Sequence, residues 1–206
     1  MFFGRQKKFA QLASDEGFTH RTSRKEWKSV TDETFCELPL LVESKVNLGI
    51  SQVLEGELDG VRFVSFEYLI VRRVPGNVHL SVVAFPRESK ESPSFSMRPK
   101  IMSFLPTMKY EKVSDVLTDG ERELFVKDTS QFRAWANAGI VSVFNNAKHV
   151  CIEGNNDWFV VYPLVVMKSF QMSLGNPLDV RAAPPEKLLG FLKDARLVVD
   201  GIREHE

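Results

Sequence analysis

Three potential metal ligands alternate along one stretch of the sequence, namely His149, Cys151 and Glu153. If this stretch forms a β-strand, alternate side chains point to the same face, with successive Cβ atoms roughly 7 Å apart. Zinc would need a fourth ligand from elsewhere, and the short Cys-x-x-Cys and His-x-x-x-His spacings are absent. The alternative is a strand with Val150 and Ile152 packed inward and a polar outer face. We favour this alternative and keep the metal site as a hypothesis.

Other residue types that could support catalysis show no useful spacing. A nucleophilic Cys–His pair would require Cys36 or Cys151 to meet a histidine in space, and no local motif places them together. Gly56 and Gly60 are not followed by the Lys-Ser/Thr pair of a P-loop, and there is no Gly-x-Ser-x-Gly elbow. We therefore expect no catalytic residues and no cofactor. A metal-binding or hydrolytic enzyme that uses the His/Cys/Glu strand face is the alternative.

An apolar segment before the last expected helix is the best candidate for an interaction surface. It contains Met167, Phe170, Met172 and Leu174, and it has neither helical nor strand periodicity. Methionine makes adaptable apolar contacts, so this segment could bind a protein partner or a second copy of the chain. The alternative is a loop folded over the core of the protein itself.

The charge balance argues against nucleic acid as a partner. The chain has 27 Lys and Arg residues and 27 Asp and Glu residues, so its formal net charge at pH 7 is zero. The N-terminal region is locally basic, and Arg5, Lys7 and Lys8 could contact an anionic membrane surface weakly and in a salt-sensitive way. A solvated helix face is the interpretation we favour for these residues.

The cysteines and apolar runs predict a cytoplasmic protein. Cys36 and Cys151 are too few for a disulfide scaffold, and we expect both to be reduced unless the fold brings them together. Residues 1–8 contain no apolar core of signal-peptide length. The longest apolar run, residues 159–167, is about half as long as a membrane-spanning helix requires.

Local patterns also predict the elements that must position these residues. In the first half, apolar residues recur at helical spacing up to Gly17, and Asp59-Gly60 is a two-residue hairpin signal. In the second half, Asp128 is a plausible helix cap, and Gly139 could divide the helix that follows it. We expect helices over 5–16, 129–144 and 184–204 and strands over 53–58, 61–74, 78–85, 95–98, 121–127, 149–153 and 158–162.

These elements together predict an α+β protein. Its antiparallel sheet or sheets would be built from sequential hairpins and covered by an N-terminal, a central and a C-terminal helix. No linker is evident, so we expect one domain over residues 1–206. Its parts would be the N-terminal helix and an irregular region in 1–45, a meander in 46–110 and a strand-helix-hairpin-helix unit in 111–206.

Several short motifs follow one another in an order that resembles a bacterial family of uncharacterised α+β proteins. The motifs are Gly17-Phe18-Thr19, Gly56 to Gly60, Phe66-Glu67-Tyr68, Phe95 to Pro99, Phe125 to Trp135, Ile152-Glu153-Gly154 and Pro184 to Glu204. Relatives in that family often accompany membrane-spanning segments. This chain differs because it has no apolar run of that length and a longer stretch between the second hairpin and the last helix. The resemblance implies the fold more than a function.

The prediction from sequence is therefore a non-catalytic binding domain. Its partner would be a protein or a second copy of the chain. Peripheral attachment to a membrane through the first helix is a further alternative.

Overall fold

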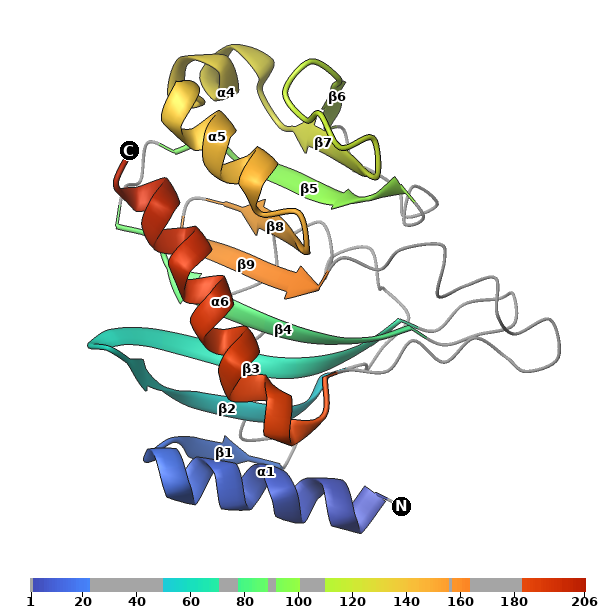
Figure 1. Cartoon of the computed structure of the whole chain (residues 1–206), viewed down its shortest axis with the longest axis vertical. Helices are drawn as coiled ribbons and strands as arrows, with labels where there is room; N and C mark the ends of the chain where they lie inside the picture. Colours follow the sequence, from blue (N-terminus) through green and yellow to red (C-terminus); the bar gives the residue numbers. More distant parts are fainter. Residues whose placement is uncertain are drawn as a thin grey trace, which may run out of the picture.

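One antiparallel sheet contains all nine strands of the described residues, and the described helices lie on one of its faces (Figure 1). The computed structural model describes residues 2–22, 50–70, 78–88, 92–100, 110–155, 157–163 and 183–206. The strands are β1 (Thr19–Arg21), β2 (Ile50–Leu58), β3 (Val61–Ile70), β4 (Val78–Pro86), β5 (Phe95–Pro99), β6 (Glu111–Val113), β7 (Arg122–Val126), β8 (Val150–Gly154) and β9 (Trp158–Pro163). The helices are α1 (Phe2–Glu16), α4 (Thr129–Trp135), α5 (Ala138–Asn146) and α6 (Pro185–Arg203). The fold is α+β, as the sequence predicted.

The β2–β3 hairpin forms where the sequence places its turn. Asp59 and Gly60 have φ values of 49° and 77°, and Leu58 pairs with Val61 on the two sides of the turn. Both residues thus adopt the left-handed conformation that a tight hairpin requires, which Asp and Gly tolerate. β4 then pairs with β3 in a continuous antiparallel register, which completes the predicted meander.

The order of the strands in the sheet differs from their order in the chain. From one edge to the other it is β1-β2-β3-β4-β9-β8-β5-β7-β6. The β8–β9 hairpin therefore lies between β4 and β5, although it comes much later in the sequence. As a result, strands from both halves of the chain share one sheet.

The central helix is divided as expected, but at a different residue. Asp128 caps α4 by accepting a hydrogen bond from the Gln131 amide at 2.8 Å. Asn137 then caps α5, since its side-chain oxygen accepts from the Gly139 and Ile140 amides at 2.9 and 3.1 Å. The break is thus caused by a second cap at Asn137, and Gly139 lies inside the first turn of α5.

Helix α6 covers the middle of the sheet with the apolar stripe that the sequence predicts. It crosses β3, β4 and β9 (Figure 1), while α1 lies beside β1 and α4 and α5 lie near the opposite edge. Along α6, Leu188, Leu192, Ala195, Val199 and Ile202 are all buried. Among the described helices, none combines the length and the apolar character needed to cross a membrane.

The face of the sheet that points away from these helices is also buried. Val64, Phe66, Val82, Ala84 and Val160 alternate with the residues that contact the helices, and each is at most 1% exposed. Polar residues on this face are therefore desolvated, which raises the free-energy cost of leaving any of them without a partner. A cluster of buried polar side chains lies on this second face.

Candidate functional site

A buried polar cluster lies on the second face, where β8 meets β5 and β9. We call it the Glu153 cluster, and it consists of Ser96, Arg98, Cys151, Glu153 and Tyr162. The sheet register creates it, because Ser96 is paired with Glu153 and Cys151 with Tyr162. The Ser96 hydroxyl donates to Glu153 Oε1 at 2.6 Å, and the Tyr162 hydroxyl donates to the same oxygen at 3.3 Å.

Burial keeps the acidic groups beside Glu153 protonated. The pKa of Tyr162 is well above its usual value, because burial disfavours the phenolate and the nearby Glu153 adds to the effect. Burial likewise raises the pKa of the Cys151 thiol well above its usual value. Since the thiolate is the nucleophile and the metal ligand, Cys151 is a poor candidate for either role.

Cys151 should therefore be inert in the folded protein. In a Cys36→Ser background, we expect native Cys151 to react with a thiol reagent about a thousandfold more slowly than in denaturant, because reaction requires both opening and deprotonation. Absorbance from 5,5′-dithiobis(2-nitrobenzoate) at pH 8 measures the rate. Ser130→Cys, at an exposed position, provides the fast control. Native labelling of Cys151 at the control rate would contradict its burial.

The structure separates the three residues of the proposed metal site. β8 begins at Val150, so His149 lies in the preceding turn and is exposed, whereas Cys151 and Glu153 are buried. Among the described residues, no group of three or more His, Cys, Asp or Glu side chains is placed to hold an ion. The favoured alternative, an outward polar face, also differs from the structure, because both faces of β8 are buried.

A second buried polar site surrounds Arg87, the residue that follows β4. The Arg87 side chain is fully buried, and its Nη1 donates to the carbonyl oxygens of Pro93 and Asn155 at 3.0 and 2.5 Å. Its guanidinium carbon lies 4.3 Å from the centroid of the Phe159 ring. Burial lowers the Arg87 pKa to about 10, although the Glu206 carboxylate partly offsets this. Strands and loops far apart in sequence form this site, which is why no local motif predicts it.

Arg122 is buried like Arg87 and Arg98, and it has a structural role at the end of α5. Its side chain is fully buried, and it donates to the main-chain oxygens of Phe144 and Ala147, each at 2.8 Å. It also donates to Asp119 Oδ2 at 2.5 Å. These contacts satisfy carbonyl groups that the end of a helix leaves without partners.

The three basic residues considered for membrane contact have different surroundings. Arg5 forms an ion pair with Glu67 through its Nε at 2.8 Å and also donates to the Ala183 carbonyl oxygen at 2.8 Å. Lys8 Nζ lies 3.7 Å from Glu186 Oε2, and Lys7 is exposed. Arg5 therefore ties α1 to β3 and to the start of α6, while its side chain stays 32% exposed.

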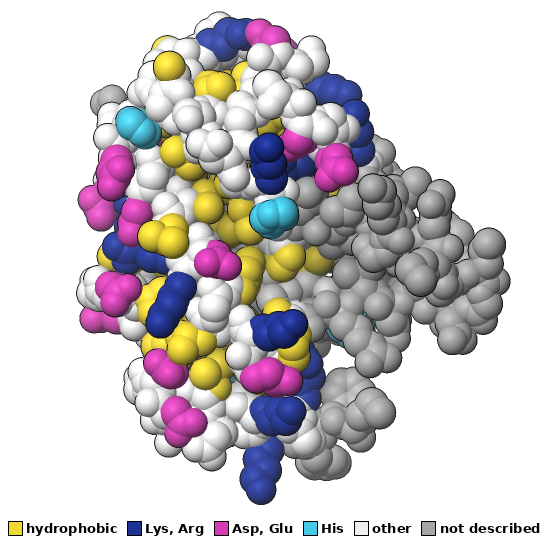
Figure 2. All heavy atoms as spheres, in the orientation of Figure 1, with side chains coloured by type: hydrophobic (Ala, Val, Ile, Leu, Met, Phe, Trp, Pro, Cys, Tyr) yellow, Lys and Arg dark blue, Asp and Glu magenta, His cyan; other side chains and the backbone are white. Residues whose placement is uncertain are grey.

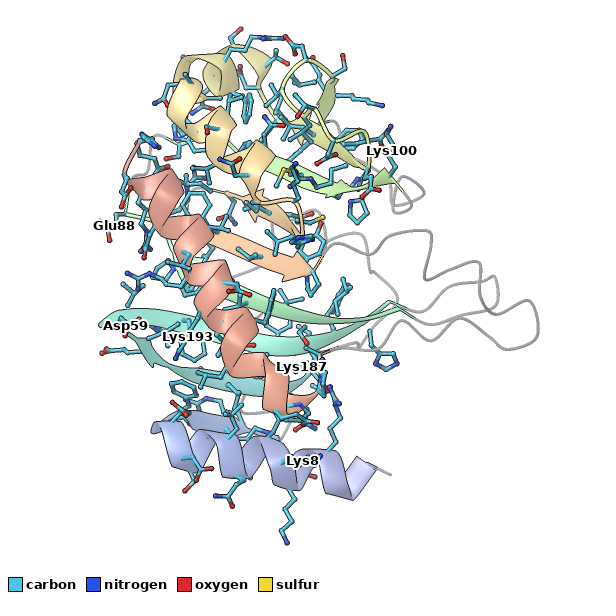
Figure 3. All side chains as sticks on the ribbon, viewed as in Figure 1. Lys8, Asp59, Glu88, Lys100, Lys187 and Lys193 are labelled. Atoms are coloured by element: carbon cyan, nitrogen blue, oxygen red, sulfur yellow. The ribbon has the colours of Figure 1, made fainter. Side chains whose placement is uncertain are left out.

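Charged side chains on the helix-bearing surface do not gather at one point. Figure 2 shows acidic and basic groups interspersed over this surface. The labelled residues in Figure 3 come from different elements and lie apart, for example Lys8 on α1, Lys193 on α6 and Lys100 at the end of β5. The described residues on this surface therefore form no basic patch of the kind that binds a polyanion.

The candidate interaction residues Met167, Phe170, Met172 and Leu174 lie outside the described residues, as does Cys36. No pattern in the sequence predicts Ser96 and Tyr162 as partners of Glu153. Their only sequence signal is that polar residues interrupt short apolar strands, and that signal does not reveal which strands pair.

Comparison with solved structures finds a protein with a similar fold. No protein-family model matches the chain, and no curated protein matches it. The crystal structure of the mycobacterial trehalose monomycolate transport factor A, TtfA, aligns with a TM-score of 0.63 and 15% sequence identity. The alignment covers 97% of this chain and 95% of that chain. At this identity, the chain is similar to TtfA in fold, over nearly the whole length of both proteins.

Proposed function

We propose that this chain is a non-catalytic accessory factor that acts by binding a protein partner during transport of a cell-envelope lipid. The observation that supports this most strongly is the structural similarity to a transport factor, which extends over 97% of the chain. The buried groups fit this proposal as well. Cys151 is protonated, and Arg122 and Arg87 donate to main-chain oxygens of the protein itself.

The strand edges help to define how such a partner would bind. Within the described ranges, the sheet has β1 and β6 as its edge strands, and each contains three residues. Such short edges offer little for a partner strand to extend, so we propose that contact occurs through side chains. The segment with Met167, Phe170, Met172 and Leu174 is the contact we propose from the sequence.

We further propose that residues 1–206 form one domain. Strands from both halves alternate in one sheet, which supports this proposal. We also propose that the chain belongs with the uncharacterised bacterial α+β proteins whose members often accompany membrane-spanning segments. The mycobacterial origin of TtfA is compatible with a bacterial family.

Deletion and complementation in the source organism test the proposed function. Loss of the gene should increase the intracellular pool of an envelope lipid precursor and decrease its exported product, measured by thin-layer chromatography of acetate-labelled lipids. Cys151→Ala and Glu153→Gln should restore export, because a binding protein needs no thiol or carboxylate chemistry. Replacing Phe170 and Met172 by Ser should not restore it at equal protein abundance. Failure of the folded Cys151 and Glu153 variants would instead indicate an enzyme, and unchanged lipids on deletion would contradict a role in transport.

A further inference from the structure

Three donors from separate segments meet at one carboxylate oxygen. Arg87 Nη2, the Ser92 hydroxyl and Trp135 Nε1 lie 3.2, 2.6 and 3.0 Å from Glu206 Oε1. Arg87 follows β4, Ser92 precedes β5 and Trp135 ends α4, so the donors come from the body of the protein. We call these three residues the Arg87 site. The geometry is that of a receptor for a carboxylate, with Glu206 as its occupant.

The occupant uses only part of the site. In the part of the chain that the structure describes, Arg87 Nε is buried and has no hydrogen-bond partner. Nε and Nη2 share one edge of a guanidinium group, and a carboxylate that binds side-on contacts both. Arg21 shows this arrangement, since its Nε and Nη2 lie 2.6 and 3.2 Å from the two oxygens of Glu55. Glu206 therefore leaves one buried donor available to a better-placed carboxylate.

The donors are held in place by contacts that do not involve Glu206. The Pro93 and Asn155 carbonyl oxygens accept from Arg87 Nη1, and aromatic rings surround the guanidinium. Its central carbon lies 4.3 Å from the Phe159 ring centroid and 5.4 Å from that of Trp135. The site should therefore persist when Glu206 leaves.

The occupant itself is attached to a short peripheral segment. α6 ends at Arg203, and residues 204–206 continue as a turn with exposed residues. Asn137 Nδ2 donates to the His205 carbonyl oxygen at 2.8 Å, and the His205 ring packs on Gly139, where an added Cβ would be 2.5 Å from it. The contacts that hold this turn include the hydrogen bonds to Glu206 and His205 and the main-chain bonds from the His205 and Glu206 amides to Ile202 and Arg203. Its release is a local opening that leaves the sheet and α6 folded, so it requires less free energy than global unfolding.

We propose that the Arg87 site binds a carboxylate on an acidic peptide segment of a protein partner, and that Glu206 is an internal ligand that this segment displaces. The inference rests on the proposed function, because it names the chemistry of the partner. A buried arginine among aromatic rings suits a peptide carboxylate, because a side-on carboxylate forms two charge-assisted hydrogen bonds on one edge of the guanidinium, and these offset the cost of desolvating both charges.

Two substitutions should open the site by different means. Glu206→Gln removes the charge of the internal ligand, and Gly139→Ala places a methyl group where the His205 ring lies. Gly190→Ala is the matched control, because a Cβ at Gly190 of α6 would have no neighbour within 4 Å. The readout is the indole ¹⁵N–¹H signal of Trp135, assigned with Trp135→Phe, because Trp135 Nε1 donates to the bound carboxylate.

The probe is the peptide acetyl-Gly-Ser-Glu-Ser-Gly-amide, with its Gln counterpart as the negative control. It should shift the Trp135 signal in a saturable way, at about tenfold or more lower concentration in Glu206→Gln than in wild type or Gly190→Ala. Gly139→Ala should bind the peptide more tightly than Gly190→Ala. The Gln peptide should have no effect.

Several outcomes would overturn the inference. They are no saturable shift in either folded opening variant, equal binding by wild type and Glu206→Gln, or binding of the Gln peptide. Sodium acetate that binds as tightly as the Glu peptide would assign the site to small carboxylates instead. This readout does not depend on lipid export. A failure here therefore leaves the proposed function standing, and a failure of complementation leaves the peptide result standing.

Discussion

Replacing Arg122 by Met should lower the free energy of unfolding by about 3–5 kcal/mol. The guanidinium is fully buried and contacts the main-chain oxygens of Phe144, Ala147 and Val150 as well as the Asp119 carboxylate. Methionine fills similar space but donates no hydrogen bonds, so buried oxygens at the end of α5 lose their partners and Asp119 loses its counter-ion. Urea denaturation followed by circular dichroism at pH 7 measures the change.

Arg133→Met provides the matched control. Arg133 also forms an ion pair with an aspartate, Asp115, at 3.0 Å to both carboxylate oxygens, but its side chain is 54% exposed. Exposed pairs contribute about 1 kcal/mol or less, so this variant should unfold close to the wild-type urea concentration. Equal losses in the two variants would show that Arg122 contributes only as a surface ion pair does.

The sequence predicted those parts of the fold that depend on neighbouring residues. The Asp59-Gly60 turn requires two residues that tolerate positive φ, and the sequence supplies them together. The buried stripe of α6 repeats at three- and four-residue steps, a pattern that one face of a helix produces. The Asp128 cap is likewise a contact between residues three positions apart. Each signal lies within one short segment, so no knowledge of the tertiary structure is needed to find it.

The candidate site could not be predicted in the same way, because its contacts join distant segments. Ser96 and Glu153 are 57 positions apart, and they meet only because β8 pairs with β5. Nothing in either strand specifies that pairing, since apolar strands of similar length are compatible with several neighbours. Arg87 and Glu206 are 119 positions apart, and in sequence both look like ordinary surface charges. Charged residues are seldom buried, so the residue type at neither position indicates a buried contact.

Buried arginines among the described residues have structural contacts. Arg87 and Arg122 each donate to main-chain oxygens, which ties loops and helix ends to the sheet. A side chain with that role is held rigidly by the protein itself. Glu153 is the most deeply buried carboxylate among the described residues, and it contacts the Ser96 hydroxyl. Substitutions at this position can separate a role in stability from a role in chemistry.

Replacing Glu153 by Leu should lower the free energy of unfolding by about 3 kcal/mol. The side chain is 1% exposed, and its Oε1 accepts hydrogen bonds from the hydroxyls of Ser96 and Tyr162 at 2.6 and 3.3 Å. Leucine would leave both buried hydroxyls without this acceptor. Glu153→Gln keeps an acceptor oxygen in the same place and should cost about 1 kcal/mol, while Glu57→Leu at an exposed position of β2 should cost still less. Urea denaturation of the three variants measures how much free energy of unfolding each one loses. If Leu and Gln at position 153 were equally destabilising, the charge of Glu153 would be what stabilises the fold, and the hydrogen bonds from Ser96 and Tyr162 would contribute little.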